Sequence, residues 1–339
     1  ILADTLDQVA EIAGVSRATV SRVINNSQNV SKSTEEKVQR AIEQSGYKPH
    51  AVARSLAKKK TGIIGLVIPE AVSRLFSDPF FAPFIRAVTE ECNELGYELM
   101  LSLLTTPDEE EKLYPDVISN SFLDGLLIAS NPVEDPLIEA LIDDGTPFVS
   151  VGRHPNEQAN YVDVNNYSGA KRATEYLLNL GHERIATITG PLNQAPAVDR
   201  LNGYKDALKE ANLEVEDDLI YEGDFTEESG SRGIHKLLAN FPTAVFAAND
   251  LIAIGVLKEL KEMNKKVPED VAIVGFDDIQ ASSAVEPPLT TISQPIDDLG
   301  RVSVRYLKKL IERKQSEEQN DEDPIRKVLD TELIVRSST

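Results

Sequence analysis

The chain has 339 residues, one cysteine and a formal net charge of −21 at pH 7. The single cysteine excludes an internal disulfide framework, and the sequence has no apolar run of 18 residues that could span a bilayer. The strong negative charge excludes binding of nucleic acid by the surface in general, because neutralisation of phosphates supplies much of that affinity.

The charge is distributed unevenly along the chain. Residues 1–60 contain ten Lys and Arg against six Asp and Glu, so this segment carries about +4, whereas the remainder carries −25. An acidic remainder repels a duplex and favours solubility. Any contact with nucleic acid must therefore come from the amino-terminal segment.

Residues 5–26, TLDQVAEIAGVSRATVSRVINN, have the pattern of two short helices joined by a tight turn. Thr5 and Gln8 form a T-x-x-Q capping box, so the first helix should begin at Leu6. Gly14 permits the positive φ that ends this helix, and Ser16 caps the next one. The pattern predicts a helix-turn-helix.

A third helix is expected to begin near Ser33. Ser33 and Glu36 form a second capping box, Val38 and Ala41 supply an apolar face, and Gly46 ends the helix. The three helices together predict an all-α domain at residues 1–49.

The second helix should present small, hydroxyl and basic side chains on its outer face and Val20 and Val23 on its inner face. Arg17 and Ala18 lie on its first turn, which is the part that reaches base edges in this motif. An ordinary helical hairpin with exposed polar groups is the alternative. Two caps, a turn glycine and apolar spacing agree within a short segment, which favours DNA binding.

Residues 50–60, HAVARSLAKKK, form a separate basic segment. It contains helix-forming residues but is too short to be stable alone, since about 12 to 15 residues are marginal in water. Leu56 is apolar without an obvious local core. One interpretation is a flexible linker. The other is a hinge helix that orders on DNA, with Leu56 wedged into a minor-groove base step.

From residue 61 onward, short apolar runs alternate with longer amphipathic stretches, which is typical of βαβ units and a parallel sheet. The predicted strands are GIIGLVIP, YELMLSLLT, GLLIAS, FVSVG, RIATITG, DLIYEG, AVFAAN and VAIVGF, with RKVLDTELIVR as a closing strand. The predicted helices include residues 82–95, 168–180, 197–211 and 251–263. About 280 residues exceed one α/β core, so we predict two doubly wound parallel-sheet subdomains, with a first crossing near Asp163.

Open α/β sheets bind ligands beyond the carboxyl ends of their strands, so the cleft between the subdomains is the expected ligand site. The side chains at these strand ends combine aromatic rings, amides, guanidinium groups and carboxylates. This mixture suits sugars, whose C–H faces stack on rings and whose hydroxyls need paired donors and acceptors. The expected effector-binding residues are Phe80, Asn131, Arg153, Arg200, Phe225, Asn249 and Asp277.

Several of these residues have an alternative, structural interpretation. Asn249 or Asp250 could cap the following helix. Arg153 could pair with a structural carboxylate, and Asp277 could cap a turn. Of the adjacent rings at positions 80 and 81, we expect one to be buried and one to face the cleft.

Catalytic motifs and metal-ligand spacings are not found in the sequence. The four histidines are scattered, and Cys92 is expected to be a buried, inert thiol. We therefore expect no enzymatic activity, no metal and no cofactor. The start of the chain lacks the features of a secretion signal, so we expect a cytoplasmic protein without membrane association.

The motifs resemble those of the LacI/GalR (lac repressor) family of transcriptional regulators. The resemblance begins with TLDQVAEIAGVSRATVSRVIN and continues through GHERIATITG, RLNGYKDAL, FAANDLIAIGVL, VAIVGFDD and PPLTTISQP, so it covers essentially the whole chain. It implies a homodimeric regulator whose domain at residues 61–339 is folded like a periplasmic sugar-binding protein. It also implies later crossings near Thr291 and Pro324, giving subdomain one at about 61–162 and 292–323 and subdomain two at about 163–291 and 324–339.

The resemblance also implies roles for individual residues. Leu56 matches the hinge leucine and Ala53 its minor-groove neighbour, and the readers of the major groove match Arg17, Ala18 and Arg22. The full expected DNA-contacting set is Thr5, Ser16, Arg17, Ala18, Thr19, Ser21, Arg22, Asn25, Thr34, Ala53, Arg54 and Leu56. In the cleft, Arg200, Asn249 and Asp277 match positions where family members contact effector.

We expect a ligand-responsive repressor of carbohydrate utilisation genes that binds an inverted-repeat DNA operator as a homodimer, with a sugar in the cleft. Purine or nucleoside effectors and a phosphorylated carrier protein are the alternatives within the family. A sugar-transport binding protein would leave the amino-terminal module unexplained. Whether the effector releases the DNA or favours its binding stays open.

Overall fold

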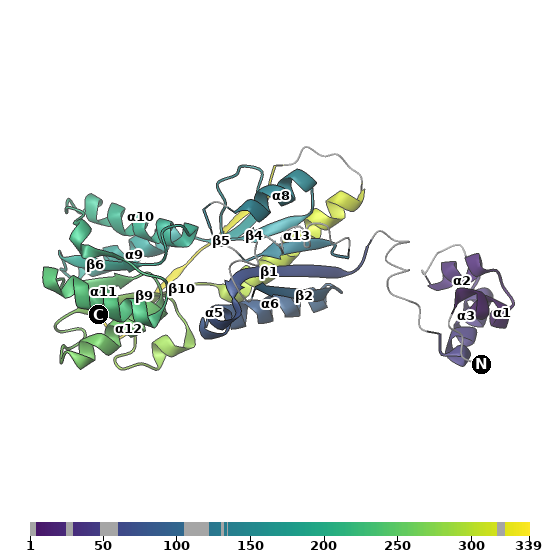
Figure 1. The fold of residues 1–339 in the computed structure, drawn as a ribbon, viewed down its shortest axis with the longest axis horizontal. Coiled ribbons are helices and arrows are strands. Elements are labelled where there is room, and N and C mark those ends of the chain that lie inside the picture. Colours follow the sequence, from purple (N-terminus) through teal and green to yellow (C-terminus); the bar gives the residue numbers. More distant parts are fainter. Residues whose placement is uncertain are drawn as a thin grey trace. The chain divides into compact units, whose positions relative to one another are not determined.

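The computed structural model describes residues 5–24, 30–47, 60–104, 122–129, 132–133, 135–316 and 323–339. The chain divides into two compact units, Ile1–Gly62 and Ile63–Thr339, both drawn in Figure 1. The predicted binding residues that lie outside the described residues are Asn25, Ala53, Arg54, Leu56 and Asn131. Most of the predicted hinge at 50–60 lies outside them as well.

The amino-terminal unit contains α1 (Leu6–Ala13), α2 (Arg17–Ile24) and α3 (Lys32–Ser45). The Thr5 hydroxyl accepts a hydrogen bond from the Gln8 N–H, and the Gln8 side chain accepts one from the Thr5 N–H, so the predicted capping box is present. Gly14 ends α1 with a φ of 65°. The Ser16 hydroxyl accepts a hydrogen bond from the Thr19 N–H at 3.2 Å. The predicted helix-turn-helix is confirmed.

The cap of the third helix differs from the prediction. Helix α3 begins at Lys32, and Ser31 rather than Ser33 is its N-cap, with an extended backbone (φ −67°, ψ 145°). The Ser31 hydroxyl accepts a hydrogen bond from the Thr34 N–H at 3.3 Å. Ser33 already lies inside the first turn, where its backbone is helical and its side chain no longer takes the capping position.

The larger unit contains two six-stranded sheets (Figure 1). Sheet one has the order β11-β5-β4-β3-β1-β2, and all its pairs are parallel. Its strands are β1 (Ile63–Ala71), β2 (Glu98–Leu104), β3 (Gly125–Ile128), β4 (Phe148–Val151), β5 (Tyr161–Val164) and β11 (Arg326–Leu329). We call the part built on this sheet subdomain one.

Sheet two has the order β12-β10-β9-β8-β6-β7 and is parallel except at β12, which runs antiparallel to β10. Its strands are β6 (Ile185–Thr189), β7 (Ile220–Glu222), β8 (Ala244–Ala247), β9 (Ala272–Asp277), β10 (Thr290–Ser293) and β12 (Glu332–Ile334). We call the part built on this sheet subdomain two.

Helices cover both faces of each sheet. In subdomain one they are α5 (Val72–Ser77), α6 (Phe81–Glu94), α8 (Pro136–Asp144) and α13 (Ile296–Ser316). In subdomain two they are α9 (Asn166–Asn179), α10 (Ala195–Glu210), α11 (Glu227–Leu237) and α12 (Asp250–Glu262), with short 3-10 turns at Asp217–Leu219, Leu238–Asn240 and Gln280–Ser283. Separate buried clusters under α6 and α13, α8, α9 and α10, and α11 and α12 confirm the doubly wound architecture. Cys92 on α6 is fully buried, and burial raises the pKa of its thiol to about 12.

The chain passes between the two sheets three times, after β5, after β10 and between β11 and β12. The stretch RKVLDTELIVR is therefore two strands in different sheets rather than one closing strand. Strand β11 pairs with β5 in sheet one, and β12 pairs with β10 in sheet two. The third crossing lies after Leu329, so the prediction near Pro324 was wrong, because β5 leaves an open sheet edge that residues 326–329 complete first.

Candidate functional site

The outer face of α2 carries Arg17, Ala18 and Arg22, whereas Val20 on the inner face is fully buried. The Arg17 guanidinium lies 3.8 Å from the Asp7 carboxylate, and both side chains are 68% exposed. Such an exposed pair is worth little, so it holds the arginine only weakly. Two guanidinium groups beside a methyl group match the donors and apolar contacts that read base edges in a major groove.

Of the hydroxyl groups predicted to contact DNA, all but that of Ser21 lie at helix N-termini. The Ser16 and Thr19 hydroxyl oxygens are 2.9 Å apart, and the Thr34 hydroxyl lies 2.8 Å from that of Ser31. Thr5 caps α1 in the same way. Helix N-termini present backbone N–H groups and a partial positive charge, and both attract phosphate.

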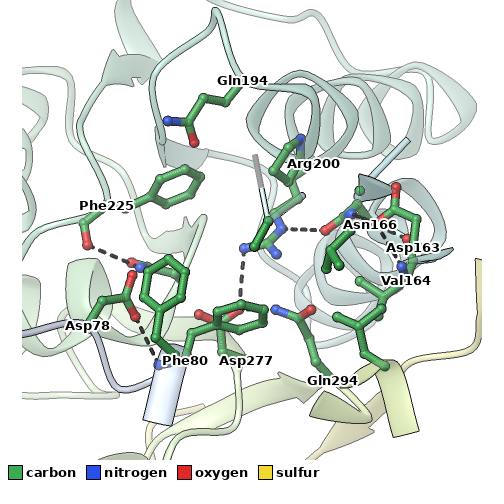
Figure 2. Close-up of a pocket in the computed structure, with 17 residues that line it drawn as sticks. Asp78, Phe80, Asp163, Val164, Asn166, Gln194, Arg200, Phe225, Asp277 and Gln294 are labelled. Atoms are coloured by element: carbon green, nitrogen blue, oxygen red, sulfur yellow. Dashed lines mark hydrogen bonds and ion pairs between the residues drawn. The ribbon is translucent and has the colours of Figure 1, made fainter. Parts of the chain in front are cut away.

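A pocket lies where the carboxyl ends of the two sheets face each other (Figure 2). It contains about 760 Å³ of empty space, part of which is open solvent. Its walls come from segments that follow strands of both subdomains. Figure 2 shows the rings of Phe80 and Phe225 on one side and the hydrogen-bonded side chains of Arg200 and Asn166 on the other.

Arg200 on α10 is the centre of the polar side. It is 5% exposed, and its Nε donates a hydrogen bond to Asn166 Oδ1 at 2.9 Å. Its Nη1 donates to the Ala248 carbonyl at 2.5 Å and to Asp277 Oδ1 at 3.4 Å. The guanidinium also lies over the Phe276 ring, 3.7 Å from its centroid. These contacts fix a cation in the wall of the pocket.

Buried carboxyl groups accompany Arg200. Burial raises the pKa of Asp277 to about 7, although the Arg200 charge opposes this shift. Burial raises the pKa of Asp163 to about 6, against hydrogen bonds from the Val164 and Arg153 N–H groups. Near neutral pH, these groups can therefore donate as well as accept hydrogen bonds.

Aromatic rings form the other side. Phe80 and Phe81 meet edge to face with centroids 5.4 Å apart, and Phe81 is 9% exposed. The Asp78 carboxylate accepts a hydrogen bond from the Phe80 N–H at 3.0 Å. Phe225 faces them from subdomain two, with its ring centroid 6.0 Å from the guanidinium carbon of Arg200. Both adjacent rings line the pocket, with Phe81 the more buried.

Two pocket residues have left-handed backbone conformations. Phe225 has a φ of 64° and Asp277 a φ of 110°. Non-glycine residues seldom adopt such conformations, which cost about 1–3 kcal/mol and concentrate at functional sites. The surrounding contacts must hold both residues in place.

Within the described ranges, no cluster of three or more His, Cys, Asp or Glu residues is arranged to hold a metal ion. The helices described include none that is long and apolar enough to cross a membrane.

Comparisons with known proteins agree with both units. Residues 5–50 match the family model described as bacterial regulatory proteins, lacI family, and residues 174–339 match the periplasmic binding protein-like domain. The HTH-type transcriptional regulator CelR of Thermobifida fusca is 41% identical over 339 residues, which cover 98% of each chain. The chain belongs to the LacI family.

Solved structures of LacI-family members have the same architecture. A structure of the transcriptional regulator CelR in complex with cellobiose aligns with a TM-score of 0.77 and 39% identity, covering 99% of this chain and 100% of that one. The lac repressor dimer bound to operator and the anti-inducer ONPF aligns with a TM-score of 0.83 and 29% identity, covering 99% and 98%. The chain is therefore a DNA-binding transcriptional regulator, and the relatives it matches are regulators rather than enzymes.

Five of the seven predicted effector-binding residues of this LacI-family chain line the pocket: Phe80, Arg200, Phe225, Asn249 and Asp277. Asn249 is also the N-cap of α12, since its Oδ1 accepts a hydrogen bond from the Ile252 N–H at 2.9 Å. Asp250 follows the cap and is fully buried. Asn249 therefore both caps α12 and lines the pocket.

Arg153 is not among the residues that line the pocket. Its Nε and Nη2 donate hydrogen bonds to the two carboxylate oxygens of Asp199 at 2.5 and 2.6 Å, and this carboxylate raises the pKa of the guanidinium. Arg153 follows β4 of subdomain one, whereas Asp199 lies on α10 of subdomain two. The alternative of a structural ion pair describes its position better than a ligand contact.

Five polar lining residues were not predicted to bind effector: Asp78, Asp163, Asn166, Gln194 and Gln294. Asn166 is the first residue of α9, and Gln194 directly precedes α10. Gln294 follows β10, a strand that the apolar pattern did not indicate, and its side chain donates a hydrogen bond to Asp277. The feature of the sequence that could have identified these residues is their position near the end of a strand or the start of a helix.

Proposed function

We propose that this LacI-family regulator binds an inverted-repeat DNA operator as a homodimer and responds to a neutral saccharide bound in the pocket between its subdomains. It acts in the cytoplasm as a repressor of carbohydrate utilisation genes and has no enzymatic activity. The observation that carries the proposal is the composition of the pocket, in which aromatic rings face a set of buried polar side chains centred on Arg200.

The chemistry of the pocket supports a saccharide. The rings of Phe80 and Phe225 offer flat apolar faces for sugar C–H groups, as in many small-molecule sites with few polar groups. On the other side, Asn166, Arg200 and Asp277 offer donors and acceptors for hydroxyl groups. The relative solved with cellobiose is 39% identical over nearly the whole chain, so a glucoside is the first candidate.

The charges of the pocket support a neutral ligand. Among the described residues that line it, Asp78, Asp163 and Asp277 accompany a single cation, Arg200, whose Nε and Nη1 already donate hydrogen bonds within the protein. A phosphorylated sugar or a sugar acid would bring a further negative charge beside these carboxyl groups. Such ligands should bind poorly.

The amino-terminal unit supplies the operator contacts. Arg17, Ala18 and Arg22 on α2 would read bases, and the hydroxyls at the helix N-termini would bind phosphates. Residues 50–60 would act as the hinge, with Leu56 in the minor groove. Two such units on a two-fold dimer require an inverted repeat.

The chain connectivity supports coupling between effector and operator. The larger unit begins at Ile63, which is the first residue of β1 in subdomain one. A ligand that changes the angle between the subdomains would therefore move the segment that leads to residues 50–60. A coupling of about 1–3 kcal/mol would give roughly 5- to 150-fold control of operator affinity.

One experiment tests both parts. The full-length protein is titrated into fluorescent inverted-repeat duplexes, alone and with cellobiose, glucose, ribose, guanine or glucose 6-phosphate, and binding is followed by anisotropy. We expect preference for a palindromic duplex over random DNA, and a shift of that affinity with a neutral saccharide. A response to guanine or to the phosphorylated sugar alone would overturn the saccharide assignment.

A further inference from the structure

Phe225 is held firmly at its backbone, although its conformation is unusual. Its φ of 64° lies in the left-handed region, and its carbonyl accepts a hydrogen bond from the Asn249 side-chain amide at 3.1 Å. On either side, Asp224 and Thr226 form the cap of α11. The direction in which the Phe225 ring leaves the chain is therefore set by its neighbours.

The ring lies directly against Gly190, which follows the last residue of β6. A Cβ atom added at Gly190 would lie 2.1, 2.3 and 2.5 Å from three carbon atoms of the Phe225 ring. Real Cβ atoms do not approach other atoms so closely. The φ of Gly190 lies outside the left-handed region, so its backbone suits alanine. Glycine is required here for space and not for its dihedral angle.

We propose that Gly190 is a positioning residue for the effector pocket, because it sets how far the Phe225 ring reaches into it. This inference rests on the proposed saccharide function. Since the Phe225 carbonyl is fixed, a methyl group at position 190 has to push the ring away from β6. Figure 2 shows the rings of Phe225 and Phe80 on the same side of the pocket, so displacement of the Phe225 ring changes the space between the two rings.

A double-mutant cycle tests the inference. In the full-length protein, Gly190→Ala should weaken cellobiose binding at least about tenfold by calorimetry, while the Tm and the operator affinity without sugar stay near wild type. In a Phe225→Ala background, the same change should alter the affinity less than about twofold, because there is no ring to displace. An equal loss in both backgrounds overturns the proposal.

Gly233→Ala is the matched control. An added Cβ there meets Ile188 and Tyr221 side-chain atoms at 2.8 Å, and Gly233 is not among the pocket-lining residues. This variant also crowds side chains of subdomain two, although less closely than Gly190→Ala does. We expect it to lower the Tm without a tenfold change in cellobiose affinity. A tenfold loss in this variant would show that general crowding, not the Phe225 ring, weakens binding.

A second readout needs no sugar. The chain has ten phenylalanines, so protein labelled with 4-fluorophenylalanine gives a small set of ¹⁹F resonances, and the one missing from Phe225→Leu identifies the ring. Gly190→Ala should shift that resonance in the absence of ligand, whereas Gly233→Ala should not. An unshifted resonance overturns the proposal. A shifted resonance in a protein that binds no sugar would overturn only the saccharide function.

Discussion

At the scale of single residues, the pocket combines buried carboxyl groups with one buried guanidinium. Asp277 interacts with Arg200 and also accepts a hydrogen bond from the Gln294 side chain. The residue is 7% exposed, and burial raises the pKa of its carboxyl group to about 7. Near neutral pH, Asp277 can therefore carry a proton and donate a hydrogen bond into the pocket, in addition to accepting one.

The raised pKa of Asp277 predicts how the stability depends on pH. Between the usual aspartate pKa near 4 and about 7, the folded protein holds a proton that the unfolded chain has released. The contribution of Asp277 to the free energy of unfolding is greatest at low pH. It is lost as the pH rises from about 4 to about 7, at up to about 1.4 kcal/mol per pH unit per proton. Asp277→Asn should therefore flatten the slope of unfolding free energy between pH 5 and 7, measured by urea denaturation.

The comparison between variant and wild type is necessary because other groups titrate in the same range. Asp163 acts in the same direction as Asp277, since burial raises its pKa to about 6. Burial lowers the pKa of His154, so its contribution is lost as the pH falls and has the opposite sign. The wild-type and Asp277→Asn slopes should differ whatever these groups contribute. Equal slopes would contradict a titrating Asp277.

At the scale of elements, the ion pair between Arg153 and Asp199 joins the two subdomains beside the pocket. The side chains are 38% and 17% exposed, and the contact is bidentate. Nearby, the Val133 N–H donates a hydrogen bond to the Asn193 carbonyl at 2.8 Å, again from subdomain one to subdomain two. Both contacts favour the arrangement of the two subdomains that the structure shows.

Breaking this ion pair should make that arrangement less favoured. Asp199→Asn is expected to weaken effector affinity roughly three- to tenfold, because the ligand must then also supply the free energy that holds the two subdomains in this arrangement. Calorimetry at low and moderate salt measures the change. The charge-reversed pair Arg153→Asp with Asp199→Arg should recover part of the affinity.

The Arg184–Glu216 pair provides the control. It is also bidentate, at 2.8 and 3.1 Å, but both residues belong to subdomain two. Glu216→Gln should leave effector affinity unchanged. A similar loss of effector affinity in Glu216→Gln and Asp199→Asn would mean that the contact between the subdomains does not influence effector binding.

The elements also show where sequence reasoning succeeds. The eight apolar runs after residue 61 are strands. Six of them lie inside a sheet, where a buried parallel strand needs a continuous apolar run, whereas β2 and β7 are partly exposed edge strands. Strands β5 and β10 were not predicted as strands, since each has four residues and includes polar positions such as Asp163 and Thr291. These strands are buried by neighbours from distant parts of the chain, and a local pattern does not reveal such neighbours.

The same limit applies to side chains in the pocket. Phe225, Asn249 and Asp277 could be predicted because each follows or ends a recognisable strand, and open sheets bind ligands at such ends. The partner of Arg153 could not, because Asp199 lies 46 positions away on another subdomain. The close approach of Phe225 to Gly190 also depends on packing between separate segments.

At the scale of the whole molecule, the charge is separated between the two units. The first 60 residues carry about +4 and the rest of the chain −25. DNA affinity must therefore come from a small set of contacts, so the loss of any one of them should lower that affinity measurably. The lysines at positions 58–60 place positive charge close to Leu56 in the sequence.

Leu56→Ala tests whether this segment contributes to specific binding. If Leu56 enters a base step and bends the duplex, its loss should weaken operator binding about tenfold or more, because the protein then also loses the phosphate and groove interactions that only a bent duplex permits. Binding to random DNA should change little, since the lysines and arginines remain. Cellobiose affinity should equal that of the wild type, because the pocket lies wholly within the larger unit. Anisotropy with operator and random duplexes, and calorimetry with the sugar, measure the three quantities. A loss of affinity for random DNA as large as that for the operator would assign Leu56 to folding of the amino-terminal unit rather than to the minor groove.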